Sequence, residues 1–157
     1  MPGYPAASQP GPYHQARPEQ IKQIAAEIAR AKRPIIYAGG GIIAANASAA
    51  LRELVAKTKI PSTMTLMGLG AFPNDDPLSL DMLGMHGTIY SNTAVHHADL
   101  LVALGVRFDD RVTGNVQAFC EHGKIIHVDI DASEINKIKS AHIPIVSDLK
   151  YALDELN

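Results

Sequence analysis

Short apolar runs alternate with helical patterns along this chain, and this alternation restricts the fold more than any other feature. Residues 100–104 (LLVAL) contain no polar side chain, as expected of a strand that is buried on both faces. Other strand-like runs occupy residues 34–38, 60–65 (interrupted by Pro61), 124–129 and 143–146. Apolar residues at helical spacing mark residues 18–32, 47–57, 88–97 and 148–156. The alternation predicts an α/β fold, a three-layer Rossmann-like parallel sheet of five to six strands with helices on both faces.

The size and composition of the chain suit one globular domain. Of its 157 residues, 46% are hydrophobic and 19% are charged, which are ordinary values for a protein with its own core. The net charge of −2 gives no electrostatic basis for binding nucleic acid or a membrane surface. We find no apolar run of about 18 residues, as a membrane span requires, and no secretory signal. The single cysteine, Cys120, favours a reducing compartment, so the expected location is cytoplasmic.

The first residues of the chain differ in composition from the rest. Residues 1–18 hold five of the ten prolines, together with glycine, serine and glutamine. This composition predicts an extended interdomain linker over residues 1–17 and a nucleotide-binding domain over residues 18–157. Domains usually connect through such segments, so we expect the chain to be part of a longer protein.

Glycine-rich or acidic segments follow three of the predicted strands. Gly39, Gly40 and Gly41 follow the first, Gly105 follows the LLVAL strand, and Asp129 ends a third. Ligands of open parallel sheets bind outside the carboxyl ends of the strands, and glycines let a ligand approach the backbone closely. The triplet does not form the GxGxxG pattern, so a tight strand-to-helix turn explains it equally well.

Several polar side chains accompany these segments. Arg107 and Arg111 flank two aspartates, and an arginine fork suits a phosphate or carboxylate. A local ion-pair network that holds the loop is the alternative. His86 precedes an expected helix start, where backbone amides favour a phosphate or ring carbonyl, although a histidine in a polar loop is the simpler interpretation. The sequence contains no His/Cys/carboxylate set with metal-ligand spacing and no GxSxG nucleophile motif, so we predict no metal ligand and no catalytic residue.

Acidic residues near the last two strands also have two interpretations. Asp129 is placed to accept hydrogen bonds from ribose hydroxyls, or to cap a helix, for which Asp131 is the better candidate. Asp148 is a candidate cap of the final helix. The methionines near the predicted crevice either fill the core or pack against a flat apolar ring; they are Met64, Met67, Met82 and Met85.

Five sequence blocks resemble the central domain of acetohydroxyacid synthases (acetolactate synthases), in the large catalytic subunit. The blocks are residues 34–41 (PIIYAGGG), 65–70 (TLMGLG), 82–88 (MLGMHGT), 105–114 (GVRFDDRVTG) and 127–131 (HVDID). They occur in this order within residues 18–157, and residues 1–4 (MPGY) resemble the family's exit from its N-terminal catalytic domain. Enzymes of this family depend on thiamine diphosphate and Mg²⁺ and also bind FAD.

The resemblance implies that this chain is the FAD-binding domain, and it assigns site residues where the motifs match. The implied FAD contacts are Gly40, Thr65, Leu66, Leu83, Gly84, Met85, His86, Gly105, Val106, Arg107, Phe108, Asp109, Asp129, Ile130, Asp148 and Leu149. The residues implied to lie at the mouth of the substrate channel, where inhibitors of the family bind, are Met85, Asp110 and Arg111.

The resemblance also implies which functions lie outside this chain. In the family, the catalytic glutamate belongs to an N-terminal domain and the Gly-Asp-Gly…Asn-Asn motif for thiamine diphosphate and Mg²⁺ belongs to a C-terminal domain. This sequence contains neither Gly-Asp-Gly nor Asn-Asn. The implied partners are those two catalytic domains, further copies in a homo-oligomer, and a candidate small regulatory subunit.

The implied parent enzyme is a transferase of branched-chain amino-acid biosynthesis (valine, leucine and isoleucine). It joins pyruvate-derived hydroxyethyl-thiamine diphosphate to a second 2-oxo acid, and the isolated chain is expected to be inactive. Two alternatives remain at this stage. One is the central domain of another thiamine-diphosphate enzyme, such as glyoxylate carboligase or pyruvate oxidase, and the other is a free-standing regulatory module that binds a nucleotide.

Overall fold

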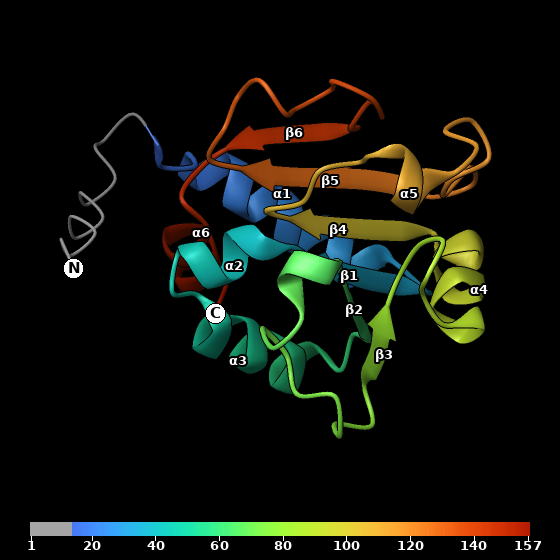
Figure 1. Ribbon diagram of the computed structural model, residues 1–157. Coiled ribbons are helices and arrows are strands. Elements are labelled where there is room, and N and C mark those ends of the chain that lie inside the picture. The colour runs from blue at the N-terminus through green and yellow to red at the C-terminus, as the bar shows by residue number, and fades with distance from the viewer. Residues whose placement is uncertain (1–13) are drawn as a thin grey trace, which may run out of the picture.

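A six-stranded, all-parallel sheet forms the centre of the protein (Figure 1), in a computed structural model that describes residues 14–157. The strand order is β3-β2-β1-β4-β5-β6. The strands are β1 (Pro34–Ala38), β2 (Ser62–Met64), β3 (Ser79–Met82), β4 (Leu100–Leu104), β5 (Lys124–Asp129) and β6 (Ile143–Val146). The α/β class, the parallel sheet and its five to six strands are confirmed.

Helices cover the two faces of the sheet, and the alternation of side chains along each strand assigns the core residues to a face. Ile36 and Ala38 of β1 belong to a core cluster that includes residues of α1 (Pro18–Arg30), α2 (Gly40–Ala44), α3 (Ser48–Thr58) and α6 (Leu149–Leu156). Ile35 and Tyr37 belong to a second cluster, with residues of α4 (Ile89–His97) and of the segment after β4. None of the helices within residues 14–157 is long and apolar enough to cross a membrane.

The structure corrects several predicted boundaries and adds four elements, one of which is the short 3-10 helix η2 (Leu66–Gly68). Strand β2 begins only at Ser62, after Pro61, which has no N–H to donate to a neighbouring strand. Strand β3 was not predicted because this half-buried edge strand has no apolar run, and its Asp81 adopts φ 56° beside an irregular pairing with β2. The short helices α2 and α5 (Asp110–Thr113) also escaped prediction, because each is too short to show a helical period.

The side of the sheet to which the chain adds its strands changes between β1 and β4. These two strands are hydrogen-bonded neighbours, yet β1 leads to β2 on one side and β4 leads to β5 on the other. The connections therefore diverge at the carboxyl ends of the two central strands, which is where doubly wound sheets hold their ligands. The strand order therefore places the segments after β1 and β4 side by side at the predicted edge.

The glycines after β1 allow its turn to lie directly against the end of β4. A Cβ atom added to Gly39 would lie 2.1 Å from the carbonyl oxygen of Gly105, and one added to Gly41 would lie 2.7 Å from the Gly105 Cα. Two hydrogen bonds join the turns: Gly39 N–H to Leu104 O (2.9 Å) and Gly41 N–H to Gly105 O (3.2 Å). Close packing of backbone thus explains the two outer glycines of the triplet without any ligand.

The last residues of the predicted linker pack against the domain. The amide of Ala16 donates to Ser147 Oγ (2.9 Å), and the Asp148 amide donates to His14 O (2.6 Å). Residues 1–13, which make up most of the predicted linker and include the MPGY block, lie outside the described residues. The predicted linker over residues 1–17 therefore stays a prediction.

Candidate functional site

All of the predicted site residues lie in segments that follow the carboxyl ends of strands. Gly40 follows β1, Thr65 and Leu66 follow β2, and residues 83–86 follow β3. Residues 105–111 follow β4, Asp129 and Ile130 end or follow β5, and Asp148 and Leu149 follow β6. Because the six strands are parallel, these segments share one edge of the sheet, which we call the carboxyl edge. In Figure 1 the arrows of β4, β5 and β6 point the same way, toward this edge.

The two glycine-rich blocks that are separated by twenty residues in the sequence lie against each other. The Met85 amide donates a hydrogen bond to Arg111 O (2.8 Å). Gly84 adopts φ +106°, and a Cβ atom there would lie 2.7 Å from the same Arg111 oxygen. Glycine is therefore required at this position for both conformation and space. The contact brings Met85, Asp110 and Arg111, the predicted channel residues, into one neighbourhood.

Arginines of the carboxyl edge are available to an anion. Arg107 and Arg111 are exposed, and neither forms an ion pair or a side-chain hydrogen bond within residues 14–157. Asp109 instead accepts a hydrogen bond from the Val112 amide through Oδ1 (3.2 Å) and caps α5. The alternative of a local arginine–aspartate ion-pair network is therefore not formed in the described part of the chain.

Apolar side chains with high exposure lie on the same edge. Met85 is 72% exposed, Leu66 69% and Ile130 48%, and such residues favour contact with a flat apolar ring over contact with water. Met67 is also exposed, whereas Met64 is fully buried and Met82 is half-buried. Met64 therefore follows the first of the two interpretations and fills the core, whereas exposed Met67 and Met85 are available to an apolar ring.

Other predicted contact residues have buried side chains, so they can offer only backbone groups to a ligand at this edge. Leu83, Val106, Phe108 and Leu149 are each at most 4% exposed. The Phe108 ring packs edge-on against His127 at a centroid distance of 5.1 Å, and it also contacts Phe119 (5.9 Å) and Tyr37 (6.1 Å). Phe108 therefore anchors the loop after β4 in the core.

Three polar residues at the edge serve local backbone geometry. Thr65 Oγ1 accepts from the Gly68 amide (2.9 Å) at the start of η2 (Leu66–Gly68), and Asp148 Oδ1 accepts from the Tyr151 amide (2.8 Å). Asp148 thus caps α6, as proposed from the sequence. Asp131 caps no α-helix; its carboxylate accepts from the Ser133 amide (2.9 Å) in a turn.

Asp129 and His127 form a buried polar pair at the end of β5. Asp129 Oδ1 accepts from the Asp131 amide (2.9 Å), and burial raises the pKa of its carboxyl group. His127 Nε2 lies 3.0 Å from Val106 O. Its Nδ1 is buried and has no hydrogen-bond partner among the described residues. Burial lowers the pKa of the His127 imidazole. A neutral His127 that donates from Nε2 satisfies Val106 O. A ribose contact by Asp129 stays a prediction.

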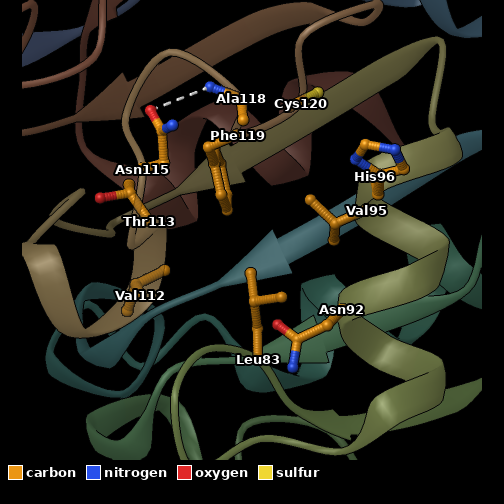
Figure 2. Close-up of a pocket in the computed structure, with 10 residues that line it drawn as sticks. All are labelled: Leu83, Asn92, Val95, His96, Val112, Thr113, Asn115, Ala118, Phe119 and Cys120. Atoms are coloured by element: carbon orange, nitrogen blue, oxygen red, sulfur yellow. Dashed lines mark hydrogen bonds between the residues drawn. The ribbon is translucent and has the colours of Figure 1, made fainter.

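A pocket of about 240 Å³ adjoins the carboxyl edge (Figure 2). Residues of α4 and of the segment after β3 face residues 112–120 across it. Burial raises the pKa of the Cys120 thiol, which makes this thiol a poor nucleophile. The lining residues are Leu83, Asn92, Val95, His96, Val112, Thr113, Asn115, Ala118, Phe119 and Cys120.

Two larger pockets, of about 540 and 560 Å³, contain none of the predicted site residues. The first lies at the amino ends of β1 and β2, and the second lies beside α3. The candidate site is accordingly an open edge rather than a closed cavity. Within residues 14–157, no three His, Cys, Asp or Glu side chains are grouped so that they could hold a metal ion.

Asn92 is a residue of the edge that the sequence interpretation missed. Its side-chain amide bonds both the N–H and the C=O of Gly84, at 3.1 and 3.0 Å. A single asparagine within a helical pattern carries no recognisable signal. The contact becomes visible only when the segment after β3 folds back over the first turn of α4.

The chain matches the family model described as "Thiamine pyrophosphate enzyme, central domain" over residues 21–156. The chain is 55% identical to "Acetolactate synthase 1, chloroplastic" of Zea mays over 139 residues. These residues make up 88% of this chain and 22% of that protein. It is 50% identical over all 157 residues to "Acetolactate synthase, chloroplastic" of Arabidopsis thaliana, covering 22% of that protein. It is 49% identical over 145 residues to "Acetolactate synthase large subunit" of Buchnera aphidicola subsp. Schlechtendalia chinensis, covering 92% of this chain and 25% of that protein. The chain therefore spans about a fifth to a quarter of the length of these relatives.

Proposed function

This chain belongs to the thiamine pyrophosphate enzyme family, of which it is a central domain, and from this premise we propose that it is the FAD-binding domain of an acetolactate synthase. The relatives named above are acetolactate synthases. In the proposed reaction, a two-carbon fragment from pyruvate is joined to a second 2-oxo acid. Because this reaction transfers a carbon fragment and consumes no electrons, the flavin serves as a structural or positioning group.

The observation that carries the FAD proposal is the combination of charge and shape at the carboxyl edge. Exposed Arg107 and Arg111 have no carboxylate partner within residues 14–157. The amide of exposed Met85 is hydrogen-bonded to Arg111 O, and exposed Ile130 follows the neighbouring strand β5. A flavin dinucleotide needs cations for its diphosphate and apolar contacts for its ring system, and the edge supplies both.

The remaining residues of the edge would present backbone to the cofactor. Gly40, Gly84 and Gly105 carry no side chain, and the side chains of Val106 and Phe108 point into the core. We therefore propose that the backbone amides and carbonyl groups of these segments are what faces the cofactor. Because the edge is open, we further propose that other parts of the longer protein complete the site.

The chemistry of the whole enzyme is proposed to depend on groups outside this chain. Thiamine diphosphate supplies the electron sink that carbanion chemistry on a 2-oxo acid requires, and Mg²⁺ holds its diphosphate. We assign both to N- and C-terminal catalytic domains of the same protein, with homo-oligomerisation and a small regulatory subunit as further partners. The plant relatives quoted above are named chloroplastic; for this chain we propose the cytoplasm.

The experiment that tests the proposal replaces Arg107 by alanine in the full-length enzyme that carries this domain. Charge-assisted hydrogen bonds contribute about 1.5–3 kcal/mol, so FAD affinity should fall roughly ten- to a hundredfold. Arg107→Lys should restore the affinity only in part, because a point charge lacks the planar fork. Arg52→Ala is the matched control, since Arg52 is exposed on α3 and lines a pocket that contains none of the predicted site residues.

Fluorescence titration of the FAD-free enzymes measures the affinities, and unchanged thermal midpoints establish that the variants are folded. If Arg107→Ala binds FAD as tightly as the wild type does, Arg107 does not contact the cofactor. An unmodified full-length enzyme that binds no FAD would overturn the proposed function itself. Turnover of glyoxylate rather than pyruvate would favour a glyoxylate carboligase instead.

A further inference from the structure

We propose that Asn92 is a positioning residue of the carboxyl edge, which holds the Gly84 peptide so that residues 83–86 stay against Arg111. The inference rests on the proposed function, because the segment that Asn92 holds is the one proposed to contact FAD. Asn92 itself is not among the proposed contact residues. It acts through the backbone that it holds.

The geometry around Asn92 is that of a two-point clamp. The Gly84 amide donates to Asn92 Oδ1 (3.1 Å), and Asn92 Nδ2 donates to Gly84 O (3.0 Å). The same Nδ2 also donates to Thr88 O (3.1 Å), at the N-cap of α4. One planar amide therefore ties the segment after β3 to the first turn of α4. Figure 2 shows Asn92 on α4 beside Leu83, the residue before Gly84.

The clamp acts at the point where the two glycine-rich blocks meet. Gly84 adopts φ +106°, and the next amide, that of Met85, donates to Arg111 O (2.8 Å). A rotation of the Gly84 peptide would break this bond and move both Met85 and Arg111. The amide of Asn92 thus contributes to holding these two residues, together with the Gly87 amide, which also donates to Gly84 O (2.9 Å).

The requirement for asparagine follows from the hydrogen-bonding groups. Gly84 presents a donor and an acceptor to the same side chain, so its partner needs an acceptor and a donor in one plane. Aspartate keeps the acceptor for the Gly84 amide but has no N–H for the carbonyl oxygen. Alanine loses both bonds. The loss of hydrogen bonding to Gly84 is therefore expected to be largest in Asn92→Ala and intermediate in Asn92→Asp.

Substitution of Asn92 should leave the fold intact, because the residue is exposed on α4 and belongs to neither core cluster. The adjacent Thr93 provides a matched control. It is exposed on the same helix, and its hydroxyl makes no hydrogen bond within residues 14–157. Asn92→Ala and Thr93→Ala therefore change helix propensity in the same direction, and only the first removes the clamp.

The first measurement is amide hydrogen exchange of peptides that cover residues 83–88 in the full-length enzyme without FAD. Two neutral hydrogen bonds contribute about 1 kcal/mol each, so exchange in Asn92→Ala should be about 5- to 30-fold faster than in the wild type. Asn92→Asp should be intermediate and Thr93→Ala unchanged. Exchange at the wild-type rate in Asn92→Ala would overturn the proposal.

The second measurement is FAD affinity of the same variants by fluorescence titration. Asn92→Ala should raise the Kd about 5- to 30-fold by the same reasoning, with a thermal midpoint close to that of Thr93→Ala. Faster exchange with a Kd within twofold of the wild type would reduce Asn92 to a purely local role and overturn the proposal. If Asn92→Ala fails to fold, Asn92→Asp is compared with Thr93→Ala in its place. If the wild-type enzyme binds no FAD, the proposed function fails, while exchange at residues 83–88 still decides whether Asn92 holds this segment.

Discussion

Replacing Gly39 by alanine should push apart the two turns that build the carboxyl edge. Gly39 has φ −110° and ψ −174°, a conformation that alanine adopts without strain, so the cost arises from space alone. The added Cβ would lie 2.1 Å from Gly105 O and 2.8 Å from Gly105 C. Both atoms belong to backbone, so no side-chain rotation can relieve the clash. The ends of β1 and β4 have to separate by about 1 Å to restore an ordinary contact distance.

The cost follows from the interactions that this separation breaks. Gly39 N–H to Leu104 O (2.9 Å) and Gly41 N–H to Gly105 O (3.2 Å) would both exceed hydrogen-bond range. Each buried group that loses its partner costs about 1–3 kcal/mol, and overpacking adds about 1–3 kcal/mol. Two lost bonds and the overpacking together amount to about 3–9 kcal/mol, which is a large part of the 5–15 kcal/mol that is typical of a domain.

The neighbouring Gly40 provides the contrast. A Cβ atom there meets Met67 Cβ at 3.1 Å and Met67 O at 3.3 Å, so the short η2 segment has to move by only a few tenths of an ångström to restore ordinary contact. Alanine also favours the helix that starts at Gly40. Gly40→Ala should therefore change the free energy of unfolding by less than about 1 kcal/mol, while FAD affinity falls if Gly40 contacts the cofactor.

Thermal and urea unfolding of the two variants and the wild type test this contrast. Since about 1 kcal/mol shifts the midpoint of a domain of this size by roughly 3 °C, Gly39→Ala should lower it by about 10 °C or more. Gly40→Ala should stay within about 3 °C of the wild type. Equal midpoints for the two variants would refute the claim that backbone packing requires the outer glycine.

Three further predictions concern the core, the pH dependence and the activity. Phe108→Ala should destabilise the chain by about 3–5 kcal/mol in urea unfolding, because the ring packs among Tyr37, Phe119 and His127; a loss below about 1 kcal/mol would show that the ring serves a ligand instead. Burial lowers the pKa of His127 below 6.5 in the folded state, so the unfolded state binds more protons below about pH 7 and stability falls as the pH decreases from there. His127→Gln should therefore show a smaller drop in midpoint than the wild type between about pH 7.5 and pH 5.5, and equal drops would contradict the assignment. The chain alone should form no acetolactate from pyruvate with thiamine diphosphate and Mg²⁺ added, because no residue replaces the cofactor's binding domains; product above a protein-free blank would refute this.

Local sequence was sufficient for the central strands. Residues 34–38, 100–104, 124–129 and 143–146 were predicted with the bounds that the structure has. Three of these strands, β1, β4 and β5, are buried on both faces over nearly their whole length, and accordingly β1 and β4 are apolar almost throughout while β5 has an apolar centre. The position of the candidate site also followed from sequence, because in a parallel sheet every segment after a strand begins at the same edge.

The contacts between segments could not be obtained in this way. The edge strand β3 has no apolar run, and the order that places β1 beside β4 depends on how the crossovers pack. That Phe108 anchors the core while Arg107, its neighbour in the sequence, stays exposed depends on which side of the loop meets Tyr37 and His127. The clamp between Asn92 and Gly84 likewise joins a helix to the loop before it. Sequence patterns report only the neighbours of each residue along the chain. The strand order, the position of Phe108 and the clamp instead arise from packing between segments that are remote in sequence or joined by a reversal of the chain. These contacts exist only in the folded structure.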